Sequence, residues 1–118
     1  MSARILFYLF LLSPTTALPS PTYAFVTVPF EDININPNEA IQANYSFGNH
    51  AIIFCFDSKF QTVGNIQWPY KGQTKNSSLP ISLKTSEKFT GQFADTNGTI
   101  KIINTTTSIL TINCQFGF

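Results

Sequence analysis

The sequence has few charged residues and few of the side chains that perform chemistry. Charged residues make up 11% of the 118 residues, and the chain contains one histidine, His50. It has no Gly-x-Ser-x-Gly elbow, no His-Glu-x-x-His pair and no glycine-rich phosphate loop. Glu31 and Asp32 are adjacent, so on a strand they point to opposite faces and cannot share one reacting centre. The sequence therefore argues against an enzyme, and His50 is expected to be a surface bystander.

An excess of either charge is also lacking. Once Arg4 is set aside, six lysines remain against six acidic residues, and they are spread along the chain. A near-neutral chain without a basic patch lacks the electrostatic attraction that nucleic acids and anionic membranes require. The expected partner is therefore a protein or a glycan, with no cofactor and no metal.

The N-terminal segment has the pattern of a secretory signal peptide. Arg4 precedes an apolar run of eight residues (5–12), and small residues follow up to Ala17. Eight apolar residues are too few for a membrane-spanning helix, which needs about 20. We expect cleavage after Ala17, with Ala24 as a second candidate site. The prediction is a signal peptide (1–17), one mature domain (18–118) without a transmembrane helix, and export to the periplasm or the cell exterior.

Alternating apolar residues dominate the rest of the chain and predict short β-strands. Ile41, Ala43, Tyr45 and Phe47 should face one core, while residues 51–56 are apolar on both faces, as in a central strand. The frequent turn signals favour a small antiparallel β-sandwich, immunoglobulin-like or related, over a small barrel. An outer-membrane-type barrel, suggested by the alternating C-terminal strand, remains an alternative. Its eight strands of about 9–11 residues need more chain than the mature domain has.

Two dipeptides predict hairpins. Gly48-Asn49 should return the following strand antiparallel to the preceding one. Asn97-Gly98 suits a type I′ turn, so residues 89–94 should pair with residues 99–103. The segment 71–78 reads as a polar loop. Phe89 and Phe93 are expected to face inward.

The two cysteines, Cys55 and Cys114, predict a single disulfide in an exported chain. With Trp68 between them, they resemble the immunoglobulin arrangement, in which a tryptophan packs on a disulfide that joins the two sheets. The pattern departs from that family because Ile112 stands where a tyrosine is expected and the chain ends four residues after Cys114. The resemblance therefore supports a sandwich rather than membership of the family.

Three further patterns concern function. Trp68 and Tyr70 border the polar segment 71–78 and are the candidate partner contacts, since exposed aromatic residues often anchor partners. Asp32-x-Asn34-x-Asn36 opens like a calcium loop but has neither the glycine nor the bidentate glutamate of one, so an asparagine-rich turn is preferred. Four sequons, expected on outward faces or turns, are glycosylation candidates in a eukaryotic host. They begin at Asn44, Asn76, Asn97 and Asn104.

These observations predict a small exported, non-enzymatic β-sandwich that binds a macromolecule or serves as a structural module. The outer-membrane-type barrel is one alternative. A secreted inhibitor or enzyme accessory is the other, because a rigid loop on a disulfide scaffold needs no sequence signature.

Overall fold

The computed structural model describes residues 23–85 and 91–117, and these residues form ten β-strands without any helix. The strands are β1 (Tyr23–Thr27), β2 (Phe30–Ile35), β3 (Ala40–Ser46), β4 (Ile52–Asp57), β5 (Val63–Tyr70), β6 (Gln73–Leu79), β7 (Ile81–Lys84), β8 (Gln92–Phe93), β9 (Asn97–Ile103) and β10 (Leu110–Gly117). The predicted signal peptide lies outside the described residues and stays a prediction. Ala24, the second cleavage candidate, lies within β1.

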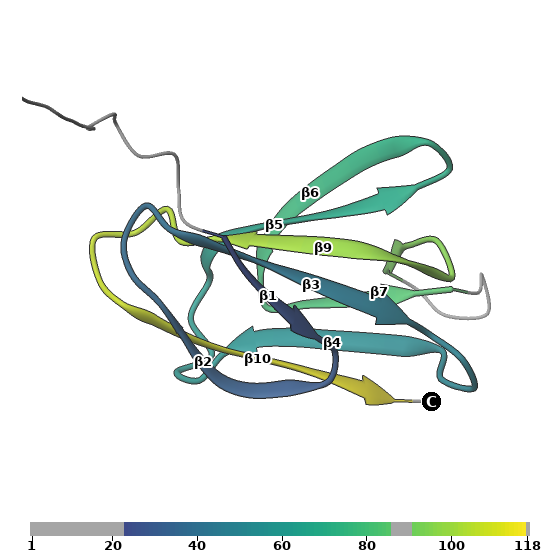
Figure 1. Cartoon of the computed structure of the whole chain (residues 1–118), viewed down its shortest axis with the longest axis horizontal. Coiled ribbons are helices and arrows are strands. Elements are labelled where there is room, and N and C mark those ends of the chain that lie inside the picture. Colours follow the sequence, from purple (N-terminus) through teal and green to yellow (C-terminus); the bar gives the residue numbers. More distant parts are fainter. Residues whose placement is uncertain (1–22, 86–90, 118) are drawn as a thin grey trace, which may run out of the picture.

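The strands form two five-stranded sheets that pack as a sandwich (Figure 1). Sheet A has the order β1-β3-β9-β5-β6, and sheet B has the order β2-β10-β4-β7-β8. The predicted all-β sandwich is confirmed. Two pairings at the sheet edges are parallel, β1 with β3 and β7 with β8, and the other pairings are antiparallel. The part of the chain that the structure describes has no helical segment able to serve as a membrane span.

The inward faces of the strands match the predicted alternation. Ile41, Ala43, Tyr45 and Phe47 are all buried, and β4 lies inside sheet B between β10 and β7. Of the apolar residues at alternate positions of β10, Leu110, Ile112 and Cys114 are buried and Phe116 is half-buried. Phe93 is half-buried, and Phe89 lies outside the described residues. Periodicity therefore placed the core correctly even where strand pairing was misjudged.

The hairpin predicted across Gly48-Asn49 is wrong. β3 belongs to sheet A and β4 to sheet B, so the chain crosses from one sheet to the other at this turn. Phe47 continues the buried face beyond the end of β3, and its amide donates to the Thr96 carbonyl at 2.8 Å. The turn signal correctly marked a change of direction, but it carried no information about which sheet receives the next strand.

The hairpin predicted across Asn97-Gly98 is also wrong. Both residues belong to β9, which pairs with β3 and β5, whereas β8 pairs with β7 in the other sheet. A Cβ atom at Gly98 would lie 2.7 Å from Pro69 Cγ and 3.3 Å from the Tyr45 hydroxyl. Glycine is needed here because neighbouring strands pack closely against its backbone, not because a turn requires positive φ.

The predicted polar loop at 71–78 is instead largely strand β6, paired antiparallel with β5. Lys71 and Gly72 connect the two strands with φ values of 51° and 77°, as both central residues of a type I′ turn require. Lysine is not the usual first residue of such a turn. Strand β6, which follows Lys71-Gly72, is polar on both faces, as suits an exposed sheet edge. The sequence therefore showed neither the usual turn residues nor the apolar alternation of a strand.

Asp95 links strand β3 to the β5–β6 hairpin. Its carbonyl accepts from the Tyr45 hydroxyl at 3.0 Å, and its carboxylate accepts from the Lys71 amide at 2.9 Å. Burial, with a smaller effect from the Asp95 carboxylate, raises the pKa of Tyr45 to about 12. The phenol therefore keeps the proton it donates at any physiological pH.

Candidate functional site

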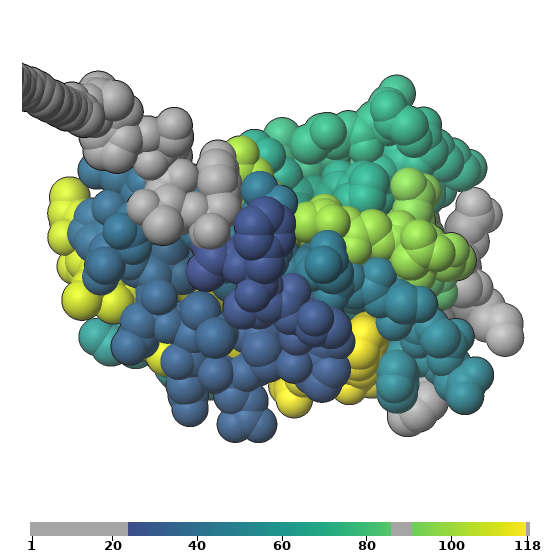
Figure 2. Space-filling model, in the orientation of Figure 1, coloured from purple at the N-terminus to yellow at the C-terminus, as the bar shows by residue number. Residues whose placement is uncertain are grey.

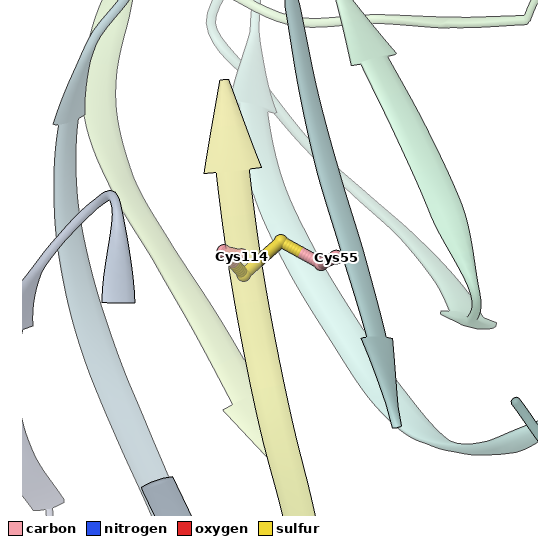
Figure 3. Close-up of a disulfide and its surroundings, with 2 residues drawn as sticks. All are labelled: Cys55 and Cys114. Carbon is pink, nitrogen blue, oxygen red and sulfur yellow. A yellow bond between two sulfur atoms is a disulfide. The ribbon is translucent and has the colours of Figure 1, made fainter. Parts of the chain in front are cut away.

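The predicted disulfide is confirmed, with Cys55 and Cys114 bonded at 2.09 Å and both fully buried. The two residues are direct partners on β4 and β10, which are neighbouring strands of sheet B, and their Cα atoms are 4.1 Å apart (Figure 3). In the immunoglobulin arrangement the bond joins the two sheets, so that part of the resemblance is wrong. The bond agrees with folding in an oxidising compartment.

The two predicted aromatic contacts occupy different environments. Trp68 is 2% exposed, and its indole Nε1 donates to the Phe93 carbonyl at 2.9 Å, which ties sheet A to sheet B. Tyr70 is half-buried, with its ring centroid 6.2 Å from that of Phe93 and 5.2 Å from Lys71 Nζ. Trp68 is thus part of the core, and the predicted partner contact in this segment rests on Tyr70.

Three of the four sequon asparagines, Asn44, Asn76 and Asn97, are exposed on strands of sheet A, the sheet nearer the viewer in Figure 2. Two of these sequons face each other across β3 and β9, with Asn44 opposite Thr99 and Ser46 opposite Asn97. Thr99 Oγ1 donates to Asn44 Oδ1 at 2.8 Å, and this bond leaves the Asn44 amide nitrogen available. Glycosylation at the three exposed positions stays a prediction.

Asn104, the fourth sequon asparagine, is fully buried, so the expectation of an outward position is wrong for it. Its Nδ2 donates to the carbonyls of Ile35 and Ser108 at 2.8 and 2.7 Å. Its Oδ1 accepts from the amide and the hydroxyl of Thr106 at 2.9 and 2.6 Å. Both amide protons are therefore in use, and a glycan on this nitrogen is incompatible with the folded state.

A cavity of about 460 Å³, which no sequence pattern predicted, lies at one end of the sandwich. It lies where the β4–β5 loop (58–62) meets the β9–β10 loop (104–109), at the left of Figure 1 and at the opposite end from the β5–β6 turn. The polar lining comes from Asp57, Ser58, Lys59, Gln61, Thr106, Ser108 and Thr111, and the apolar lining comes from Val63, Ile109 and Leu110.

Hydrogen bonds hold both walls of this cavity in place. Ser58 donates to the Thr111 carbonyl with its amide at 2.9 Å and with its hydroxyl at 3.1 Å, which fixes the first loop to β10. Asn104 fixes the second loop through its bonds to Thr106 and Ser108. The cavity is therefore built on loops with little freedom to rearrange.

Asp57 contributes a buried carboxylate to the cavity lining. It is 3% exposed, and its Oδ2 accepts from the Lys59 amide at 3.2 Å. Its Oδ1 receives no hydrogen bond and no ion pair from any residue the structure describes. A buried carboxylate normally has its charge balanced by a nearby donor or cation, so this oxygen is open to a partner at the cavity.

Two large apolar side chains on the loops that form the cavity project into solvent. Phe60 is 63% exposed and lies between Lys59 and Gln61, which both line the cavity, while Ile109 is 59% exposed and lines it directly. Phe60 has a φ of 53°, a conformation that bulky residues rarely adopt. Its ring stacks on that of Phe56 with a centroid separation of 4.8 Å. The fold thus holds an aromatic ring outside the core at some conformational cost.

A visible signal could have pointed to this end of the molecule. Phe60 stands within a short polar stretch, between Asp57-Ser58-Lys59 and Gln61-Thr62. Ile109 ends the polar run 105–108 and directly precedes the apolar alternation that begins at Leu110. A large apolar residue in a polar turn has no neighbouring apolar pattern that would bury it.

The other chemical candidates are separated from this cavity. His50 precedes β4, at the opposite end of that strand from Asp57, and its ring stacks on Phe116 at 4.5 Å. The Asp32-x-Asn34 pattern lies in strand β2 rather than in a loop, and Asn34 Oδ1 accepts from the Thr111 hydroxyl at 2.8 Å. Across residues 23–85 and 91–117, no group of three or more His, Cys, Asp or Glu side chains could hold a metal ion.

No protein-family model, no curated protein and no solved structure matches this chain.

Proposed function

We propose that this chain is an exported, non-enzymatic β-sandwich module that binds a macromolecular partner through its cavity end. The cavity end is the surface formed by loops 58–62 and 104–109 together with the cavity between them. The observation that carries the proposal is the exposure of Phe60 and Ile109 on the two loops that form a cavity with a buried carboxylate. Exposed apolar anchors near polar groups are the usual composition of an energetically important contact.

The rigidity of the cavity end supports a role in binding a partner. The two loops are tied to β10 and to Asn104, so a partner would meet a preformed shape and would pay little entropy for ordering it. The exposed ring of Phe60 is also fixed, because it stacks on Phe56 and because its amide donates to the Asp57 carbonyl at 2.7 Å.

The proposal is tested by removing the apolar anchors one at a time. Phe60→Ser and Ile109→Ser should each lower partner recovery at least tenfold, a loss of about 1.4 kcal/mol or more, as expected of a central contact. Recovery is measured by chemical crosslinking in cells that export the protein, followed by quantitative mass spectrometry of the captured protein and glycan.

Phe25→Ser provides the matched control, because Phe25 is 72% exposed but lies on edge strand β1. This variant should recover the partner as well as the wild type does. Equal losses in all three variants would mean that surface apolarity matters rather than the cavity end. Undiminished recovery by both loop variants would overturn the proposal.

A further inference from the structure

Building on the proposed function, we propose that the partner is a protein that inserts a lysine or arginine side chain into the cavity, where its cationic group meets Asp57 Oδ1. The inference names the chemistry recognised at the cavity end.

Asp57 carries a negative charge at the cavity. Its side chain is 3% exposed, its Oδ1 has no protein donor in the described chain, and that oxygen is not among the fully enclosed polar atoms, so it remains open at the cavity. An ammonium or guanidinium group at that oxygen supplies both the hydrogen bond and the opposite charge. Among ordinary protein side chains, lysine and arginine present such a group at the end of a long stem.

The shape and lining of the cavity also suit a long basic side chain. Val63, Ile109 and Leu110 provide apolar walls beside the polar groups. The methylene stem of a lysine or arginine buries well against such walls while its charged end reaches a polar group. A volume of about 460 Å³ is within the range of small-ligand sites and is ample for one side chain.

Lys59, the other charged residue in the lining, does not neutralise Asp57. Its side chain is exposed, and it forms no ion pair with Asp57 or with any other described residue. Only its backbone amide contacts the carboxylate, at Oδ2. The chain's own lysine thus leaves Oδ1 unoccupied, and its positive charge should weaken the binding of a second cation nearby.

The inference is tested with small probes that need no knowledge of the partner. The probes are N-acetyl-lysine methylamide and N-acetyl-arginine methylamide, with N-acetyl-norleucine methylamide as the neutral control. Binding is followed by the amide NMR shifts of the disulfide-bonded protein. Both cationic probes should shift amides in segments 57–61 and 106–111 in a saturable manner. Norleucine should bind at least tenfold more weakly.

Two variants then test the charge itself. Asp57→Asn should weaken the cationic probes at least tenfold, and Lys59→Gln should strengthen them by about two- to fivefold, because a nearby like charge is removed. Asp32→Asn, which neutralises an exposed carboxylate on β2, is the matched control and should leave binding unchanged. If Asp57→Asn perturbs the whole spectrum, Lys59→Gln alone decides.

Equal binding of norleucine and lysine probes, shifts confined to other segments, or no gain from Lys59→Gln would each overturn the inference. So would saturable binding of Ca²⁺ at Asp57 that excludes the cationic probes. The two proposals can fail separately: if Phe60→Ser loses the cellular partner while Asp57→Asn retains it, the cavity end still binds a partner and only the recognition of a basic side chain is wrong.

Discussion

At the scale of single residues, the buried side chain of Asn104 links several segments of the fold by hydrogen bonds. Its side chain joins the carbonyl at the end of β2 to the β9–β10 loop through Ile35 and Ser108. Its backbone amide donates to the Glu39 carbonyl at 2.9 Å, and its own carbonyl accepts from the Asn38 amide at 3.0 Å. The residue therefore fixes one wall of the cavity from inside the core.

We predict that Asn104→Asp lowers the free energy of unfolding by at least about 2 kcal/mol. The new carboxylate oxygen would face the two carbonyl oxygens to which Nδ2 now donates, and each buried group left without its bond costs about 1–3 kcal/mol. Urea denaturation followed by tryptophan fluorescence measures the change. Asn76→Asp, at an exposed position of edge strand β6, should stay within about 0.5 kcal/mol of the wild type. Similar losses in both variants would contradict the role assigned to Asn104.

Single residues also show where sequence reasoning stops. The alternation around Cys114 correctly indicated that this cysteine faces the core, because a period of two is a local property of a strand. The Asn104 sequon reads the same as the one at Asn97, yet the first is buried and the second exposed. The difference comes from Ile35 and Ser108, which lie 69 residues before and 4 residues after Asn104. Contacts of this kind leave no local pattern.

At the scale of strands, the sequence predicted which segments are extended far better than it predicted their partners. Both expected hairpins failed because a turn signal reports a reversal of the chain and not the sheet in which the next strand lies. The edge strand β6 was missed because its exposed polar residues lack the apolar alternation that marks a half-buried strand. The cavity end depends on two loops that meet only once both sheets are formed, so no local sequence pattern predicted it.

The close packing of β5 on β9 gives a prediction at this scale. Gly98→Ala should destabilise the protein by about 1–3 kcal/mol, because its Cβ would lie 2.7 Å from Pro69 Cγ and force the two strands apart. The thermal unfolding of Gly117→Ala, where no atom lies within 4 Å of the new Cβ, provides the control. A double variant that adds Pro69→Ala should recover part of the loss. If the two substitutions are simply additive, the proposed close contact is not the cause.

At the scale of the whole molecule, the disulfide joins two strands that the sheet already holds together. β10 pairs with β2 on one side and with β4 on the other. The bond therefore adds little to the local attachment of this strand. Its main effect should be on the unfolded chain, in which it closes a loop between residues separated by 59 positions.

The last prediction follows from that difference between local and global stabilisation. Replacing both cysteines by alanine should lower the free energy of unfolding by about 4 kcal/mol, the chain-entropy value for a loop of this length. Because β10 is held on both sides, hydrogen exchange should accelerate together in β2, β4 and β10 as global unfolding becomes more frequent. Earlier exchange in β10 alone would show that the bond acts as a local clamp.

Since both cysteines are fully buried, a reductant added to the native protein should also act slowly, at the rate at which the sandwich opens. Rapid reduction without loss of structure would show that sheet B opens around the bond while the rest of the fold remains intact.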